Sequence, residues 1–288
     1  MIQTVDNGTM TRTDFQSPMK TPFIKTLIAA LFCCASAAQA LPLRSEHAIV
    51  VSDDTGQVLL EKGSATMVPI ASLTKLMTAM VVLDSKPDMN ASISIEPADV
   101  DVLKHSKSHV PVGTKLARKE IFRLALMSSD NRAAASLART YPGSNAAFEQ
   151  AVQRKLTSLG MHNTVLKEPT GLSPENMSTA ADLAKMAQAA SHYPEIVNVT
   201  TDRADTIRMN GRPFTFHNTN QLVGASGWNV LLSKTGFTNE AGHCLIMRIQ
   251  QAGAHATLVL LNASANSTRA LDALNIRKYL SSHRTQLR

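Results

Sequence analysis

Apolar and polar positions along the chain predict strands near both ends and helices between them. Residues 48–51 and 57–61 are short apolar runs on either side of the turn-forming segment 53–56, a pattern typical of a β-hairpin. Turns that contain glycine separate three further apolar runs, at 228–235, 242–250 and 255–261. We therefore expect the first and last strands to pair in one sheet, with a helical insertion between them.

Between these strands, apolar residues recur at helical spacing. The run 69–80 has apolar side chains at 73, 76, 77 and 80 with small residues between them, which predicts a buried helix entered near Ile70. The pattern predicts four further helices. Two of them cover 118–127 and 268–280, one covers 145–159 and ends at Gly160, and one begins after an N-cap at Ser178 or Thr179.

The first 40 residues have the pattern of an export signal. A basic segment at 19–25 precedes an apolar stretch of about a dozen residues, which is too short to span a bilayer. Small residues at 38–40 then fit a cleavage site, and synthesis is expected to begin at Met19. The sequence therefore predicts a signal peptide over 1–40, a mature domain over 41–288 and a periplasmic protein.

Composition excludes several classes of function. The 288 residues carry a net charge of +7, but the charges are scattered, so no nucleic-acid partner is expected. Two of the three cysteines leave with the signal peptide, and Cys244 lies in an apolar run that predicts a buried thiol. His105 and His109 are four residues apart but have no third ligand nearby, so neither a metal nor a cofactor is expected.

Candidate chemistry begins with Ser72 and Lys75. Residues three apart on a helix share one face, so the two side chains are expected to meet. Burial lowers the pKa of a lysine, and its neutral amine then takes the proton of a serine hydroxyl. The spacing alone is weak evidence, because Ser17 and Lys20 repeat it within the leader.

Two further polar motifs follow in order. Ser129-Asp130-Asn131 interrupts an apolar helical pattern, and Asp130 is expected to brace that junction. Lys234-Thr235-Gly236 is expected at the end of a strand, where the glycine lets another backbone approach. Ser-x-x-Lys, Ser-x-Asn and Lys-Thr-Gly in this order form the triplet of the β-lactamases and penicillin-binding proteins.

Over the segments 68–77, 124–134, 168–173, 217–220 and 234–242 the chain resembles the low-molecular-mass penicillin-binding proteins of the S11 D-Ala-D-Ala peptidase family. Within it, the chain is most similar to the penicillin-binding protein 7/8 endopeptidase type. The resemblance implies an α/β (α+β) class and a penicillin-binding/β-lactamase-like fold, an antiparallel sheet flanked by helices. The sheet subdomain is expected at about 41–82 and 191–288, and the inserted helical subdomain at about 83–190.

The resemblance also implies the roles of the site residues. Ser72 attacks a carbonyl, Lys75 takes its proton, and Ser129 relays a proton to the leaving amine. Lys234 keeps this region positive and lowers the pKa of Lys75. The N–H groups of Ser72 and Phe237 form an oxyanion hole. The remaining substrate-binding positions are Asn131, Thr235 and Gly236.

A D,D-endopeptidase is therefore expected, which cuts peptide cross-links in peptidoglycan through an acyl-enzyme on Ser72 and is acylated covalently by penicillin. Its alternative is a D,D-carboxypeptidase, which is disfavoured because 260–265 has no arginine for a terminal carboxylate and Arg269 comes later. With no further domain after the closing helix, we expect at most loose membrane association.

The residues also disfavour a serine β-lactamase and an inactive binding module. A serine β-lactamase needs a base for deacylation, and the candidate Glu168 lies in a segment, 168–173, that matches the peptidase pattern. An inactive peptidoglycan-binding module is disfavoured because all three motifs are intact.

Overall fold

The computed structural model describes residues 41–283, and its framework is a five-stranded antiparallel sheet with the order β2-β1-β11-β10-β9. The first and last strands, β1 and β11, pair directly, so the predicted pairing across a helical insertion is confirmed. The predicted hairpin is β1–β2. The strands of this sheet are β1 (His47–Ser52), β2 (Val58–Lys62), β9 (Val230–Thr238), β10 (Gly242–Gln251) and β11 (Ala254–Ala263).

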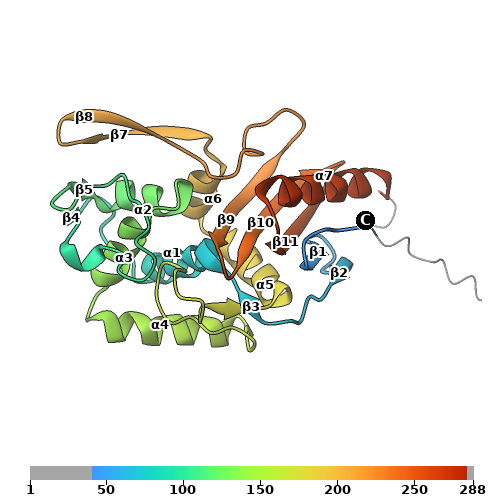
Figure 1. The fold of residues 1–288 in the computed structure, drawn as a ribbon, viewed down its shortest axis with the longest axis horizontal. Helices are drawn as coiled ribbons and strands as arrows, with labels where there is room; N and C mark the ends of the chain where they lie inside the picture. Colours follow the sequence, from blue (N-terminus) through green and yellow to red (C-terminus); the bar gives the residue numbers. More distant parts are fainter. Residues whose placement is uncertain (1–40, 284–288) are drawn as a thin grey trace, which may run out of the picture. The chain divides into compact units, whose positions relative to one another are not determined.

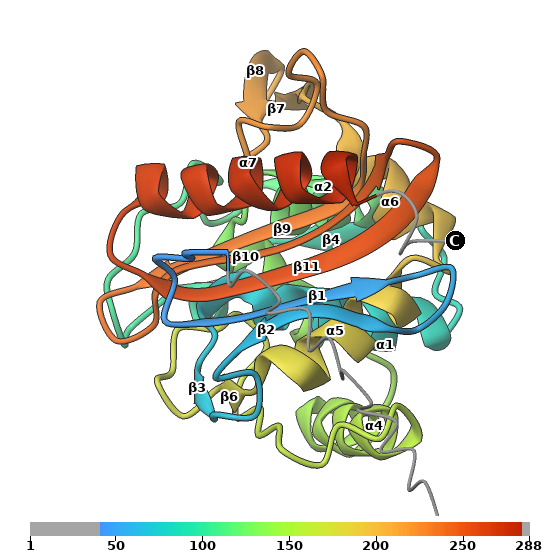
Figure 2. The ribbon, with the colours of Figure 1, turned by 90° about the vertical axis from the view of Figure 1, so that its right-hand side faces the viewer.

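Helices cover both faces of the sheet, which explains why its inner strands are unbroken apolar runs. In β1, Ala48 and Val50 pack with α7 (Asn266–Ser282), whereas Ile49 and Val51 join the core that contains the other helices. α7 lies across one face (Figure 2). Successive side chains of a strand point to opposite faces of the sheet. A shift of β1 by one residue in its pairing would therefore exchange the side chains that face α7 with those that face the other helices, and it is strongly disfavoured.

The central helix α1 (Thr74–Asp84) is buried along most of its length, because nearly all of its residues are apolar or small. A single 3₁₀ turn, η1 (Ala71–Leu73), precedes it, so the helix predicted from near Ile70 is confirmed with a tightened first turn. The helices in contact with α1 are α2 (Arg118–Met127), α3 (Asn131–Arg139), α4 (Asn145–Ser158), α5 (Ala180–Ala190) and α6 (Pro194–Thr201).

Helix ends follow the local signals in the sequence. Gly160, just after α4, has φ +62°, a conformation that glycine adopts without steric cost. Thr179 caps α5, since its hydroxyl accepts a hydrogen bond from the N–H of Asp182 at 3.1 Å. The expected helices 118–127 and 268–280 are confirmed as α2 and α7.

Several elements were not predicted. The hairpin of β7 (Ala204–Met209) and β8 (Arg212–His217) projects from the body (Figure 1), and it buries few side chains, so its apolar pattern is sparse. The others are α6 and two short ribbons, which pair β4 (Ser92–Ser94) with β5 (Lys115–Ala117) and β3 (Val68–Pro69) with β6 (Met177–Ser178).

The position of the Lys-Thr-Gly motif in its strand differs from the prediction. The strand expected to end at Thr235 continues to Thr238, because residues 236–238 pair with residues 242–244 of β10. Lys234-Thr235-Gly236 therefore lies inside β9, which is the edge strand of the described sheet.

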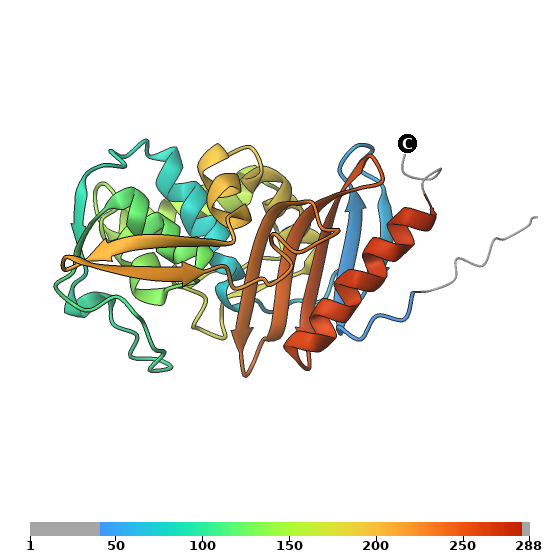
Figure 3. The same ribbon diagram turned by 90° about the horizontal axis from the view of Figure 1, so that it is seen from above.

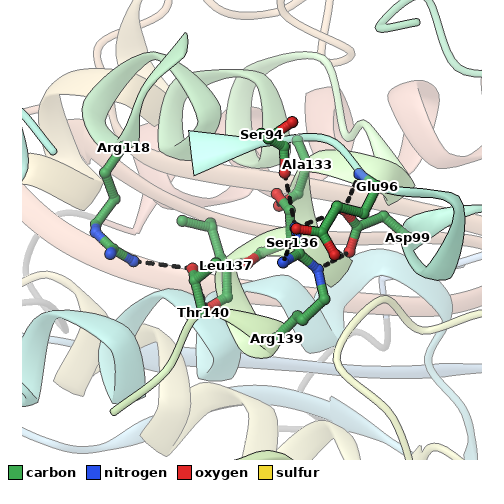
Figure 4. A network of polar contacts seen from close by, with 9 residues as sticks. All are labelled: Ser94, Glu96, Asp99, Arg118, Ala133, Ser136, Leu137, Arg139 and Thr140. Carbon is green, nitrogen blue, oxygen red and sulfur yellow. Dashed lines mark hydrogen bonds and ion pairs between the residues drawn. The ribbon is translucent and has the colours of Figure 1, made fainter. Parts of the chain in front are cut away.

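An ion pair between partly exposed Arg139 and buried Asp99 fixes the start of the segment 100–109. Arg139 donates through Nε and Nη2 to the two carboxylate oxygens of Asp99, at 2.8 and 2.9 Å, and also bonds the carbonyl of Ser94 (Figure 4). Two parallel bonds of this kind are strong and directional. At the other end, Val110 is fully buried and its carbonyl accepts from Arg132. The segment between these anchors runs beside the candidate site.

The predicted signal peptide, residues 1–40, lies outside the described residues. Among the helices of 41–283, none is long and apolar enough to cross a membrane. The proposed boundaries between a sheet subdomain and a helical subdomain stay a prediction.

Candidate active site

Ser72 and Lys75 meet at the start of α1, as their spacing predicts. The Nζ of Lys75 lies 2.7 Å from the Oγ of Ser72, and it donates to the Oδ1 of Asn131 at 2.7 Å and to the carbonyl of Thr170 at 2.6 Å. A neutral amine has two hydrogens and one lone pair. With Asn131 and Thr170 taking the two hydrogens, the lone pair faces the hydroxyl of Ser72.

The surroundings of Lys75 favour this neutral form. Its side chain is 1% exposed, and burial lowers its pKa from 10.5 to about 8. The carboxylates of Glu168, Asp130 and Asp101 oppose the shift in pKa. The neutral amine is therefore accessible near neutral pH, where an ordinary lysine is fully protonated.

Lys234 and Ser129 form a second pair. The Nζ of Lys234 donates to the Oγ of Ser129 and to the carbonyl of Thr235, both at 2.9 Å. Burial first, and then the positive charges of Lys75 and Arg269, place the pKa of Lys234 well below its usual value. The repulsion between the two ammonium groups thus lowers the pKa of Lys234, whereas burial alone lowers the pKa of Lys75. The prediction that Lys234 lowers the pKa of Lys75 is therefore wrong.

The junction between α2 and α3 positions the Ser-x-Asn motif. Ser129 has φ +60°, a left-handed conformation that is costly for serine. The next residue holds it there, because Asp130 caps α3 through the N–H of Ala133 and accepts from Ser108 at 2.7 Å. The predicted bracing role of Asp130 is confirmed.

The edge strand β9 passes close to the start of α1 at Gly236. A Cβ at this position would lie 2.9 Å from the carbonyl oxygen of Ile70 and 3.2 Å from the backbone nitrogen of Ser72, so only glycine fits without displacing its neighbours. An edge strand leaves backbone N–H groups unpaired along its outer side. Phe237 follows directly, with its ring exposed and stacked on His243.

The other predicted substrate-binding side chains also lie around Ser72. Asn131 bonds Lys75 through its oxygen and donates through Nδ2 to Ser106 at 2.7 Å. Thr235 donates to Thr219 at 2.6 Å. The structure therefore brings all three motifs together at one place.

Sequence reasoning missed the contribution of Thr170 and Gly171. The carbonyl of Thr170 orients Lys75 across 95 residues of sequence, and Gly171 packs its backbone on the peptide that joins Ala71 to Ser72. A Cβ on Gly171 would lie 1.9 Å from the carbonyl oxygen of Ala71. The segment 168–173 is visible in the sequence only as a family pattern, because contacts between distant residues leave no local periodicity.

Glu168 is fully engaged in holding this loop. Its carboxylate accepts from the backbone N–H of Thr170 at 2.7 Å and of Gly171 at 2.6 Å, and from the side chain of Asn176 at 3.0 Å. A carboxylate whose two oxygens are bonded to the protein in this way is poorly placed to activate water. The geometry therefore counts against a β-lactamase.

Other candidates take no part in this site. Burial raises the pKa of Cys244 to about 11, so its thiol stays protonated, as its buried position predicts. Arg269 is 6% exposed and bonds the carbonyl of Cys244 at 2.6 Å. Within residues 41–283, no group of three or more His, Cys, Asp or Glu side chains is placed to hold a metal.

Comparison with known proteins agrees with this geometry. The profile of the D-alanyl-D-alanine carboxypeptidase family, peptidase S11, matches residues 34–265. A D-alanyl-D-alanine endopeptidase of Pseudomonas aeruginosa is 44% identical over 246 residues, which cover 83% of this chain and 79% of that protein.

Two solved structures are similar in fold. The DD-transpeptidase of Streptomyces K15 superposes with a TM-score of 0.77 at 28% identity, over 83% of this chain and 97% of that one. Penicillin-binding protein D2 of Listeria monocytogenes, in its cefotaxime-bound form, gives a TM-score of 0.70 at 25% identity, over 82% and 97% of the two chains.

Proposed function

This chain belongs to the peptidase S11 family, and we propose on that premise that it is a D-alanyl-D-alanine endopeptidase which cuts peptide cross-links in peptidoglycan. The proposal rests mainly on the hydrogen bonds of Lys75. Its amine donates to Asn131 and Thr170, so its lone pair faces the hydroxyl of Ser72. The similarity to the Pseudomonas endopeptidase supports an internal amide bond as the substrate.

In the proposed reaction, Ser72 attacks the carbonyl of a D-alanyl residue while Lys75 takes the hydroxyl proton. The N–H groups of Ser72 and Phe237 receive the oxyanion, and each such donor contributes about 2.7–4 kcal/mol. Ser129, hydrogen-bonded to Lys234, passes a proton to the leaving amine. Water then hydrolyses the acyl-enzyme. A β-lactam enters the same path and stops at the acyl-enzyme, so these compounds are the proposed covalent inhibitors.

The proposed place of action is the periplasm. The export pattern of residues 1–40 and the single buried thiol of the described domain support it. Recovery of a protein with Leu41 at its N-terminus from a periplasmic extract is the expected result.

Digestion of cross-linked sacculi tests the proposed function. We expect mass analysis to show loss of cross-linked muropeptide dimers and a matching gain of monomers, because the attacked bond lies within the cross-link. Enzyme first inactivated with penicillin is the control. Loss of terminal D-alanine with dimers unchanged would show a carboxypeptidase instead.

Acylation by a labelled penicillin should depend on pH through Lys75. The reactive form is the neutral amine, so below its pKa of about 8 the second-order rate constant is expected to rise about tenfold per pH unit. Above about pH 8 it should become constant. The measurement runs from pH 6 to 9.5, with circular dichroism at each pH to confirm that the fold persists. A rate that does not change between pH 6 and 8 would contradict the assignment of Lys75 as the base.

A further inference from the structure

An ion pair joins the two sides of the active site at its outer edge. Lys104, in the segment 100–109, pairs with Glu240, in the turn between β9 and β10, although 136 positions separate them in the sequence. The segment and the turn project from the same side of the molecule (Figure 3). The side chains of Lys104 and Glu240 are 31% and 38% exposed, so the pair lies at the surface.

The ion pair completes a closed ring of contacts. On one side, the segment 100–109 is bound to the Ser-x-Asn motif, through Ser106 to Asn131 and through Ser108 to Asp130. On the other side, β9 leads from the turn back to Gly236, which lies against the backbone of Ser72. Asn131 is joined in turn to Ser72 through Lys75.

The proposed function, on which this inference rests, sets the direction of the substrate. The leaving amine faces Ser129 and Lys234, and the carbonyl oxygen lies at the N–H of Phe237. The acyl side of the substrate must then continue along β9 in the direction away from Lys234, towards Thr238 and Glu240. The segment 100–109 and the turn after β9 flank this direction, and the Lys104–Glu240 pair joins them.

We propose that the Lys104–Glu240 pair is a latch that selects substrates by whether they have a free end. A peptide with a free terminus enters the closed ring end first. A cross-link is attached to glycan on both sides of the scissile amide, so it has no end to thread and enters only sideways, after the latch opens. The endopeptidase activity thus requires the latch to open, whereas cleavage of free-ended peptides and acylation by penicillin do not.

The structure makes such opening easy. A solvent-exposed ion pair contributes little to stability and is screened by salt. The segment is anchored at Asp99 and Val110, while Val102 and Leu103 between them are exposed and make few contacts. The carboxylate of Asp101 accepts three backbone N–H bonds within the segment, at 2.7–3.0 Å, so the turn that carries Lys104 keeps its shape when Lys104 and Glu240 separate. Ser106 and Ser108 stay bonded to the Ser-x-Asn motif.

A reversible clamp tests the latch. In the double variant Lys104→Cys/Glu240→Cys, a short bifunctional methanethiosulfonate reagent joins the two new thiols, and dithiothreitol removes it. The protein used begins at Leu41 and so lacks Cys33 and Cys34, while Cys244 is buried and does not compete. Each single variant, treated with the same reagent, is the matched control. Three rates are measured, namely labelled-penicillin acylation, cleavage of a soluble cross-linked peptide dimer without glycan, and dimer loss from intact sacculi.

With the clamp closed, we expect sacculus cleavage to fall at least about tenfold and to recover with dithiothreitol, while the other two rates stay within about twofold. Unchanged sacculus cleavage in the clamped protein would overturn the latch and leave the proposed function intact. A protein that cleaves no sacculi even when unclamped, but still reacts with penicillin, would instead refute the proposed endopeptidase function.

Charge variants give an independent measurement. Glu240→Gln should raise the rate on sacculi at low ionic strength, and added salt should remove its advantage over the unmodified protein. The exchanged pair Lys104→Glu/Glu240→Lys restores the attraction and should return the rate to its original value. A lower sacculus rate in Glu240→Gln would mean that the pair holds substrate, which contradicts a latch.

Discussion

Ser72→Ala is expected to abolish covalent penicillin binding and to reduce sacculus cleavage at least about a thousandfold. The hydroxyl is the nucleophile in the proposed reaction, and among the described residues no other hydroxyl is hydrogen-bonded to the Nζ of Lys75. The side chain is half-buried and the change removes a single oxygen atom, so the midpoint of urea unfolding should change little. Mass spectrometry of the intact protein after incubation with penicillin provides the measurement.

A serine at the other end of the same helix provides the control for this prediction. The hydroxyl of Ser85 donates only to the carbonyl of Val82, so Ser85→Ala should keep full acylation. A penicilloyl adduct on Ser72→Ala, or unchanged hydrolysis, would refute the assignment of the nucleophile and with it the proposed mechanism.

Gly171→Ala should have the second large effect, although residue 171 takes no part in the chemistry. Its φ of +86° is left-handed, and the added Cβ would lie 1.9 Å from the carbonyl oxygen of Ala71. Backbone strain and overpacking together should cost about 2–5 kcal/mol of unfolding free energy. Relief of the clash moves the carbonyl of Thr170 away from Lys75, so acylation should slow at least about a hundredfold.

The turn of the β7–β8 hairpin offers a matched glycine. Gly211 has φ +79°, but a Cβ there would meet no atom within 4 Å, so Gly211→Ala carries the backbone strain without the clash. We expect this variant to be about 1–2 kcal/mol less stable to unfolding and to keep its full acylation activity. Equal acylation rates in the two variants would show that the contact of Gly171 with Ala71 does not position the site. Urea unfolding and acylation kinetics are measured on both.

Predictions from sequence succeeded where the information is local. The spacing of Ser72 and Lys75 placed both on one face because a helix fixes the relation between residues three apart. The cap at Thr179 and the glycine after α4 mark helix ends through their own backbone preferences. The sheet was predictable because strands covered on both faces are continuous apolar runs.

Predictions from sequence failed where a residue is held by a contact far away in the chain, or where an element buries few side chains. The hairpin β7–β8 gave no clear pattern because it buries only a few side chains. The end of β9 was misplaced because residues 236–238 are held by β10 rather than by their own preferences. Neither the acceptor at Thr170 nor the contact of Gly171 was visible.

The class of fold and the proposed reactive groups could be predicted from the residues alone, because secondary structure and motif spacing depend on neighbours along the chain. The environment of these groups, and the access that the proposed latch gives to substrates, required the folded structure. The pKa of Lys75 depends on burial by several elements, and the latch depends on Lys104 meeting Glu240. Both follow from packing between segments far apart in the chain, which local sequence preferences do not encode.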